Sequence, residues 1–148
     1  MFDIMGDIKL TVDLVVTAGR GTHIVLITRR HEPFLDKLTL PGGYFHNSDI
    51  SIKAACARQG ERVGLDIRPS SLQFLTELDC VTRDPRPGDR RISFAYTFDY
   101  PDKETLCDNI RLLNNMELVH VAEVSSLREE DFGFDHWRAI LALKAKYR

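Results

Sequence analysis

The chain has 148 residues, of which 43% are hydrophobic and 28% are charged; these are ordinary values for one globular domain. A domain of this length can bury roughly 70% of its unfolded surface, so the composition argues against general disorder and predicts a single domain over residues 1–148. The formal net charge of −2 lacks the basic excess of a duplex-binding domain, which argues against a nucleic-acid partner.

The first part of the chain predicts a β-hairpin. Residues 1–7 carry two acids and lack the apolar segment of a signal peptide. Residues 8–18 and 23–30 are rich in β-branched residues and predict two strands, which the turn signal at residues 19–21 would join. A loop with two prolines and two glycines follows these strands.

Residues 49–63 have the pattern of an amphipathic helix. Ser48 or Asp49 is the expected N-cap, and Gly64 is the expected C-terminal stop. Gly60 lies inside the helix and should cost about 1 kcal/mol relative to alanine. One face is apolar except for one amide and is the expected core side. This face consists of Ile52, Ala55, Cys56, Gln59 and Val63.

The rest of the chain predicts three more strands and a helix. Residues 72–82 and 92–100 predict a second strand pair around a polar loop. Residues 101–115 have the composition of a loop, and residues 117–124 predict a strand. A last helix is expected over residues 134–148. The order of strands, helix, strands and helix predicts a layered α+β fold.

The segment from Gly43 to Leu65 has the spacing of a known sequence motif. Residues 30–43 resemble the entry to a Nudix box. The pattern of that box is G-x5-E-x7-R-E-U-x-E-E-x-G-U, where U is an aliphatic residue. Counted from Gly43, the pattern ends at Gly64-Leu65 with no insertion or deletion. The resemblance implies a Nudix-type α/β/α sandwich with a mixed sheet.

Further segments resemble one branch of the Nudix superfamily. These segments are residues 82–86, 92–96 and 134–136. The branch contains ADP-ribose pyrophosphatases and ADP-ribose-sensing regulators of NAD metabolism. The resemblance covers nearly the whole chain and implies a small-molecule nucleotide ligand, a nucleoside diphosphate such as ADP-ribose.

Most functional positions of the box carry other residues. The residues that match the pattern outright are Gly43, Glu61, Gly64 and Leu65. The replacements are Asp49 for the first glutamate, Ala57 for the arginine, Arg58 for the next glutamate, Gln59 for the aliphatic residue and Arg62 for the last glutamate. Positions 58, 61 and 62 share one face of an α-helix. Three glutamates would give that face a charge of −3, whereas Arg58, Glu61 and Arg62 give +1.

These replacements bear on the metal that the resemblance implies. Magnesium prefers several oxygen ligands, and in this family helix carboxylates hold it against the diphosphate, where it neutralises charge and activates water. The remaining candidate metal ligands are Glu61 and Asp49, and Glu61 is also the candidate catalytic residue. Because Glu61 is expected to pair with Arg58, we expect magnesium to be held poorly and pyrophosphate hydrolysis to be weak or lost.

The arginines of the helix have two interpretations. Arg58 and Arg62 either form a solvated helix face or contact the diphosphate in place of a metal, since a guanidinium donates two hydrogen bonds to phosphate at once. Gly42 and Gly43 either let the backbone approach a phosphate or form a turn that needs positive φ.

Three more arginines outside the helix are candidate ligand-binding residues. They are Arg30 at the end of a predicted strand and Arg83 and Arg86 in the polar loop. For each of them, simple exposure to solvent is the alternative.

The cysteines and apolar segments bear on location. Cys56, Cys80 and Cys107 are odd in number and form no C-x-x-C pair, which favours reduced thiols in a cytoplasmic protein. No apolar run approaches the roughly 20 residues of a membrane span, so no membrane partner is expected.

Three functions of different classes follow from these patterns. The first is a nucleotide-binding domain without efficient catalysis, the second an active Nudix hydrolase that cleaves ADP-ribose or a related dinucleotide, and the third a non-catalytic regulatory or protein-interaction module. Many relatives form homodimers, so the resemblance implies a homodimer as one assembly. The sensing regulators carry a winged helix after the Nudix domain, and because this chain ends at Arg148, we do not expect direct control of DNA.

Overall fold

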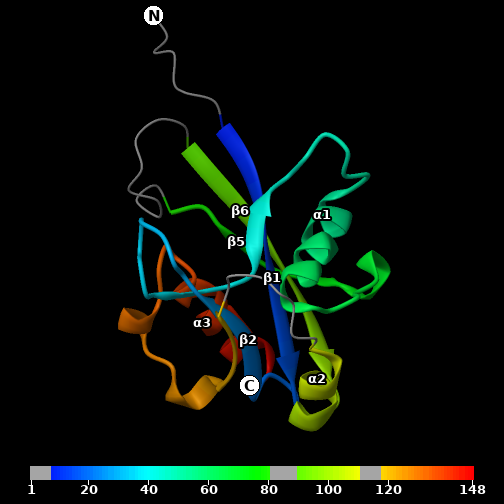
Figure 1. Ribbon diagram of the computed structural model, residues 1–148, viewed down its shortest axis with the longest axis vertical. Helices are drawn as coiled ribbons and strands as arrows, with labels where there is room; N and C mark the ends of the chain where they lie inside the picture. Colours follow the sequence, from blue (N-terminus) through cyan, green and yellow to red (C-terminus); the bar gives the residue numbers. More distant parts are fainter. Residues whose placement is uncertain (1–7, 81–89, 111–117) are drawn as a thin grey trace, which may run out of the picture.

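The computed structural model describes residues 8–80, 90–110 and 118–148. Within these ranges, seven strands form one mixed sheet in the order β3-β2-β1-β6-β5, with β4 paired to β1 and β7 paired to β2 (Figure 1). The strands are β1 (Ile8–Ala18), β2 (His23–Thr28), β3 (Leu38–Thr39), β4 (Gly42–Tyr44), β5 (Gln73–Leu78), β6 (Arg90–Tyr100) and β7 (Leu118–Glu123).

Three α-helices and four short 3-10 helices complete the described part of the chain. The α-helices are α1 (Ile52–Arg58), α2 (Lys103–Asn109) and α3 (Trp137–Lys146). The 3-10 helices are η1 (Gln59–Val63), η2 (Pro69–Ser71), η3 (Val124–Ser126) and η4 (Glu129–Asp131). None of these helices is long and apolar enough to cross a membrane.

A parallel pair of strands forms the centre of the sheet. β1 and β6 pair along their whole length, from Ile8 opposite Arg90 to Ala18 opposite Tyr100. Parallel strands commonly have both faces covered, and β1 is accordingly buried from Val12 to Ala18, whereas its first residues are exposed or half-buried. The other strand pairs are antiparallel, including the predicted β1–β2 and β5–β6 pairs, which are confirmed.

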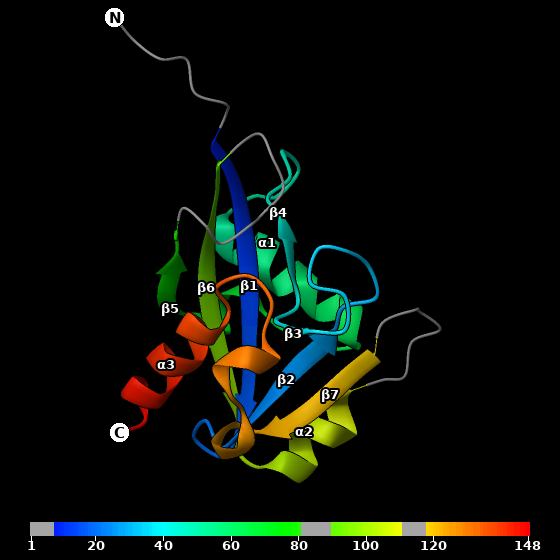
Figure 2. The ribbon, with the colours of Figure 1, turned by 90° about the vertical axis from the view of Figure 1, so that its left-hand side faces the viewer.

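The two faces of the sheet carry separate parts of the core. Val12, Leu14 and Val16 of β1 pack with residues of α1 and α2. Val15, one position out of phase, packs with Ile140 and other residues of α3. Side chains of a strand alternate between its faces, so this division follows from the sequence of β1. α1 and α3 thus cover opposite faces of the sheet (Figures 1 and 2), and the predicted α+β fold with a mixed sheet is confirmed.

Two predictions around the first helix need correction. Its N-cap is Ser51, whose hydroxyl accepts a hydrogen bond from the Ala54 N–H at 3.0 Å, rather than Ser48 or Asp49. The α-helix ends at Arg58, and residues 59–63 continue it as a 3-10 helix. The predicted stop at Gly64 is confirmed, because this residue is left-handed with φ 74°.

Some predicted loops contain regular structure. α2 lies inside residues 101–115, where Asp102 caps the helix by accepting from the Thr105 N–H at 2.7 Å and Leu106 is fully buried. β3 and β4 lie inside the predicted loop before α1 and pair with β2 and β1. The last helix begins at Trp137 rather than at residue 134, since Phe134 has a positive φ of 55°.

Candidate functional site

A cavity of about 210 Å³ opens beside the central strand, and we call it the arginine cavity. β1, β3 and β4 contribute to its walls, together with the segment that precedes α3. Among the described residues that line it, the charged side chains are Arg29, Arg62, Arg91 and Asp13, with His136 beside them. Among these described residues, three guanidinium groups therefore face one carboxylate.

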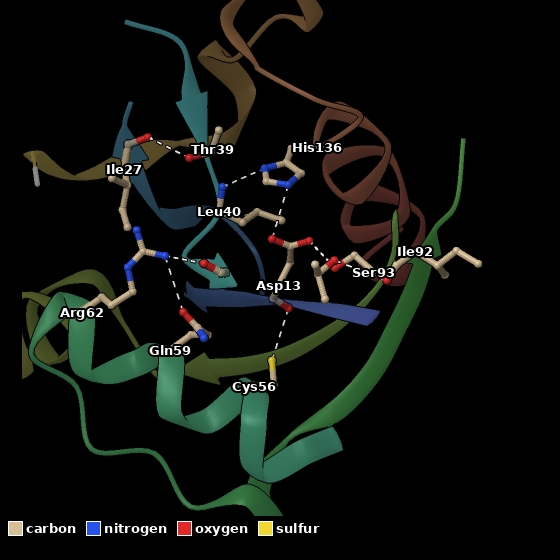
Figure 3. A network of polar contacts seen from close by, with 12 residues as sticks. Asp13, Ile27, Thr39, Leu40, Cys56, Gln59, Arg62, Ile92, Ser93 and His136 are labelled. Atoms are coloured by element: carbon tan, nitrogen blue, oxygen red, sulfur yellow. Dashed lines mark hydrogen bonds and ion pairs between the residues drawn. The ribbon is translucent and has the colours of Figure 1, made fainter. Parts of the chain in front are cut away.

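Arg62 reaches the arginine cavity from η1. Its Nη1 donates to the backbone carbonyl of Gly42, in β4, and lies 3.5 Å from Oε1 of Gln59, which accepts a second hydrogen bond (Figure 3). Gln59 is only 4% exposed, so its amide is a buried polar group that needs a partner, and Arg62 provides one. The two residues thus fix the guanidinium against β4.

Arg29 and Arg91 are held by other parts of the cavity wall. Arg29 follows β2, donates from Nε to the Pro33 carbonyl at 2.6 Å and lies over the ring of Phe134, 5.0 Å from its centroid. Arg91, in β6, donates from Nε to the hydroxyl of Tyr44 at 2.9 Å. Three arginines from separate parts of the chain thereby line one cavity.

Asp13 is the acid of the cavity and is buried, with 5% of its surface exposed. Ser93 donates its hydroxyl to one carboxylate oxygen, and Nε2 of His136 lies 3.3 Å from the other (Figure 3). The Leu40 N–H donates to Nδ1 of His136 at 3.0 Å, which leaves the ring proton on Nε2, pointing at Asp13. The buried carboxylate is therefore satisfied inside the protein and joins β1, β6 and the segment before α3.

Cys56 packs beneath the same strand. Its thiol donates to the Asp13 carbonyl at 3.3 Å. Burial, followed by the negative charge of Asp13, raises the pKa of the Cys56 thiol to about 12. A thiol that stays protonated is a poor nucleophile, so Cys56 has a packing role.

Close packing explains the first of the two glycines in the cavity wall. A Cβ on Gly42 would lie 2.1 Å from Oδ1 of Asp13 and 2.6 Å from the Val12 carbonyl, so no other residue fits there. A Cβ on Gly43 would meet only the end of the Gln59 side chain, at 3.1 Å. Neither glycine has a positive φ, so the turn interpretation is wrong. The approach of β4 to β1 is what requires Gly42.

A second cavity, of about 310 Å³, borders α1 and contains the remaining helix candidates. Arg58 binds Asp49 there through two hydrogen bonds, Nε to Oδ1 at 3.0 Å and Nη2 to Oδ2 at 2.9 Å. The hydrogen bond from Arg58, followed by that from the His46 N–H, lowers the pKa of Asp49. Glu61 lines the same cavity and is exposed. The expected Glu61–Arg58 pair is thus wrong, because the carboxylate that binds Arg58 is Asp49.

The residues present do not fit a magnesium ion. In the second cavity both oxygens of Asp49 already accept from Arg58, which leaves Glu61 beside a guanidinium. In the arginine cavity, Asp13 is bonded to Ser93 and His136. No group of three or more His, Cys, Asp or Glu side chains in the described ranges is placed to hold a metal. Magnesium needs several oxygen ligands in octahedral geometry, which these arrangements do not offer.

The structure divides the residues that the sequence singled out. Gly42, Gly43 and Arg62 come together in the arginine cavity, whereas Asp49, Arg58 and Glu61 line the second cavity. Arg30 is exposed and lines neither of them. Arg83 and Arg86 lie outside the described residues, so their role stays a prediction.

Sequence reasoning missed several residues of the cavity. They are Asp13, Arg29, Tyr44, Phe134 and His136. Asp13 carried a usable signal, because one acid inside an apolar β-strand must find partners or a function. Phe134 and His136 lie in one of the segments that resemble the Nudix branch, but their place in the cavity depends on how the segment before α3 packs on the sheet.

Comparisons with known proteins agree with this architecture. The sheet with helices on both faces is the fold of a Nudix-type α/β/α sandwich, and residues 7–141 match the model of the NUDIX domain family. The chain therefore belongs to the Nudix family. A comparison with curated proteins found no match.

Solved structures share the fold at low sequence identity. The Nudix domain of Shewanella oneidensis NrtR, solved with ADP ribose, has a TM-score of 0.75 and 20% identity over 99% of this chain and 91% of that one. A Francisella tularensis bifunctional NMN adenylyltransferase/ADP ribose pyrophosphatase, solved with AMP and a manganese ion, has a TM-score of 0.73 and 21% identity over 99% and 44%. A MutT/nudix family protein from Enterococcus faecalis has a TM-score of 0.67 and 19% identity over 99% and 64%, so this chain spans less than two thirds of that protein.

Proposed function

We propose that this chain binds a nucleoside diphosphate derivative such as ADP-ribose, and that its magnesium-dependent pyrophosphate hydrolysis is weak or lost. The observation that carries this proposal is the convergence of Arg29, Arg62 and Arg91 on one cavity. Guanidinium groups keep their charge and match phosphate oxygens with paired hydrogen bonds. The whole chain has a formal charge of −2, so the cavity is a local focus for an anion.

The size of the cavity suits the charged centre of such a ligand. Pockets that enclose a complete drug-sized ligand have volumes of roughly 300–1,000 Å³, whereas the arginine cavity has about 210 Å³. A diphosphate would fill this space, and its sugar and base would extend toward the mouth. Tyr44 lies in the wall and is 40% exposed, so its ring is accessible to a ligand.

The relatives support the ligand class. The NrtR Nudix domain was solved with ADP ribose and the Francisella enzyme with AMP and manganese, and both share this fold. The absence of hydrolysis is supported by the replaced carboxylates, since Arg58 and Arg62 occupy two of the glutamate positions of the box. The cytoplasmic location and the homodimer stay predictions.

An active hydrolase is the second candidate. Family membership and the nearness of Asp49 and Glu61 in the second cavity favour it. In that case Glu61 would act as the base, and Asp49 would have to leave Arg58 to help hold a metal. The two candidates differ in what they require of magnesium, which makes them separable by one experiment.

The test is a calorimetric titration of the protein with ADP-ribose, first in EDTA and then in magnesium, followed by chromatography for AMP. We expect binding in EDTA and no AMP in either buffer. AMP that forms only with magnesium, and that disappears in Glu61→Gln, would establish the hydrolase instead. If neither binding nor turnover is observed, both candidates are refuted and the protein-interaction module is favoured.

A variant pair places the binding. Arg91→Gln should weaken ADP-ribose about tenfold or more, because a hydrogen bond between charged groups contributes roughly 1.5–3 kcal/mol. Arg138→Gln is the matched control: it removes the same charge from an exposed position on α3 that lines neither cavity. Equal weakening by both variants would indicate a general effect of charge and would remove the arginine cavity from the proposal.

A further inference from the structure

His136 uses both of its ring nitrogens inside the wall of the arginine cavity. Nδ1 accepts a hydrogen bond from the Leu40 N–H at 3.0 Å, and Nε2 lies 3.3 Å from Oδ1 of Asp13 (Figure 3). His136 is 4% exposed and Leu40 is 3% exposed, so both ends of the first bond are shielded from water. His136 also lines the cavity, so its contacts define part of the space that a ligand would enter.

Leu40 belongs to a segment that forms one side of the cavity, and we call residues 39–44 the wall segment. All of its residues except Pro41 line the cavity. The Pro41 carbonyl accepts a hydrogen bond from the Leu14 N–H at 2.8 Å, and β4 pairs with β1. His136 adds a hydrogen bond from a distant part of the chain. The wall segment is thus held by the central strand and by His136.

Asp13 connects His136 to the wall segment a second time. Its Oδ1 lies 3.3 Å from Nε2 of His136 and is also the atom that a Cβ on Gly42 would meet at 2.1 Å. His136 therefore acts on the wall segment at two points, directly at Leu40 and through Asp13 at Gly42. A change in the ring affects the part of the wall that a bound ligand would contact.

The hydrogen bond to Leu40 requires one protonation state of the ring. A neutral imidazole with its proton on Nε2 accepts at Nδ1, whereas an imidazolium has N–H groups on both nitrogens. In the charged form, two hydrogens would face each other across the 3.0 Å between Nδ1 and the Leu40 nitrogen. A buried N–H that loses its acceptor is costly, so the ring and the wall segment would have to move apart.

The other charged or titratable side chains of the cavity behave differently near neutral pH. Those described are Asp13 on β1, Arg29 after β2, Tyr44 on β4, Arg62 on η1 and Arg91 on β6, and Asp135 precedes His136 in the chain. Arginine keeps its charge, while tyrosine ordinarily titrates at about pH 10 and aspartate at about pH 4. Among these described residues, histidine is therefore the type that changes charge over about pH 5–8.

We propose that His136 is a positioning residue for the anionic ligand: in its neutral form it holds the wall segment in place for binding, and protonation of the ring releases that segment and lowers the affinity. This inference rests on the proposed function and adds a pH dependence to the same site. Affinity is highest above the pH at which the ring titrates and falls as the pH drops through it.

The first test is a calorimetric titration with ADP-ribose in EDTA, repeated at pH values from about 8 to about 5. The diphosphate of ADP-ribose is esterified at both ends, so its charge stays constant over this range. The wild type should bind about tenfold more weakly at the lowest pH, the change expected when a buried N–H loses its hydrogen bond. His136→Ala lacks the acceptor and should bind weakly at every pH.

His136→Gln separates the position of the wall segment from the charge of the ring. An amide carries an acceptor and a donor and does not titrate, so the glutamine can accept from the Leu40 N–H and donate to Asp13 at every pH. Its affinity should be close to that of the wild type at about pH 8 and should not fall at about pH 5. His31→Gln is the matched control. It makes the same substitution at an exposed histidine that lines neither cavity, and it should keep the wild-type pH dependence.

NMR of the wild type gives a second readout that needs no variant. The carbon-bound ring protons of His136 report its protonation, and the amide proton of Leu40 reports the hydrogen bond between them. Both signals should change with the same midpoint as the affinity for ADP-ribose. Thermal unfolding at each pH checks that the wild type and each variant stay folded.

The outcomes separate this inference from the proposed function. Equal affinity of the wild type for ADP-ribose at about pH 8 and about pH 5 would refute the inference and leave the proposed function standing. A loss of affinity in His136→Gln as large as in the wild type would assign the pH dependence to another group, and so would a Leu40 amide signal that does not follow the ring. If the wild type binds no ADP-ribose at any pH, both proposals are wrong.

Discussion

Arg58 and Arg62 are four residues apart in the chain but contact different partners. Arg58 neutralises Asp49, whose side chain is 7% exposed, and so fastens the loop before α1 to the end of that helix. Arg62 donates hydrogen bonds to the Gly42 carbonyl and to the Gln59 amide oxygen. A buried or half-buried acid is stable when it is paired, which makes the first arginine a structural residue. The second lies in the wall of the arginine cavity.

The Asp49–Arg58 pair predicts a pH dependence. The pKa of Asp49 in the folded protein lies below its ordinary value of 3.8, chiefly because of the hydrogen bond from Arg58. Its contribution to the free energy of unfolding is therefore present above about pH 3.8 and is lost as the pH falls through the lower, folded pKa.

Arg58→Gln tests this dependence. The variant should move the pKa of Asp49 back toward 3.8, but not fully, because the His46 N–H still donates to the carboxylate. Carbon-13 NMR of the side-chain carboxyl during an acid titration measures this shift. Urea unfolding over the same pH range should show a weaker loss of stability in the variant. An unchanged pKa of Asp49 would mean that the ion pair does not form in solution.

The change of helix type explains why positions 58 and 62 do not share a face. Four residues advance about 40° around an α-helix but about 120° around a 3-10 helix. Because α1 ends at Arg58 and η1 begins at Gln59, Arg62 is rotated away from Arg58 and toward β4. Gly60 lies in this transition, where a Cβ would be 3.0 Å from the Leu65 carbonyl. The sequence pattern alone assumed a uniform α-helix and therefore predicted one charged face.

The start of α1 gives a test at the level of the element. Ser51→Ala should lower the free energy of unfolding by about 1 kcal/mol, because it removes the acceptor for the Ala54 N–H. Ser48→Ala changes the same residue type three positions earlier, at the exposed site that the sequence also favoured, and should have an effect within about 0.5 kcal/mol. Urea unfolding of both variants makes the comparison. A larger loss in Ser48→Ala would place the N-cap where the sequence pattern put it.

Elements differed in how well the sequence predicted them. β1 was predicted to the residue because it is rich in β-branched residues, is buried from Val12 to Ala18 and ends at a glycine turn. α2 was missed because its sequence is mostly polar and one leucine, Leu106, supplies its fully buried contact. β3 and β4 have only two and three residues, and tertiary pairing with β2 and β1 determines them rather than local preference.

The arginine cavity is a product of the whole fold. Asp13 and Ser93 are 80 residues apart in the chain, and the parallel pairing of β1 and β6 brings their side chains together. Arg29, Arg62 and Arg91 come from the end of β2, from η1 and from β6. A motif read along the chain finds Arg62 by its spacing, but it cannot place residues whose nearness depends on strand order. This is why the sequence predicted part of the site and the topology supplied the rest.

The contrast between the acidic chain and its basic cavity predicts how a ligand stabilises the protein. A ligand that binds only the folded state at 100 times its dissociation constant raises the free energy of unfolding by about 2.7 kcal/mol. We expect ADP-ribose to raise the unfolding temperature equally in EDTA and in magnesium, and adenosine at the same concentration to have a much smaller effect, because it lacks the diphosphate that the three guanidiniums attract.

Salt tests whether this attraction is electrostatic. The Debye length falls from about 10 Å at 0.1 M to about 3 Å at 1 M, so added sodium chloride should reduce the stabilisation by ADP-ribose, measured as the shift in unfolding temperature against a ligand-free sample at the same salt concentration. The small effect of adenosine should change little, since it involves no charge. If adenosine stabilised as well as ADP-ribose, and salt left both effects unchanged, recognition would lie in the base and ribose, and the convergence of Arg29, Arg62 and Arg91 would serve the fold rather than an anion.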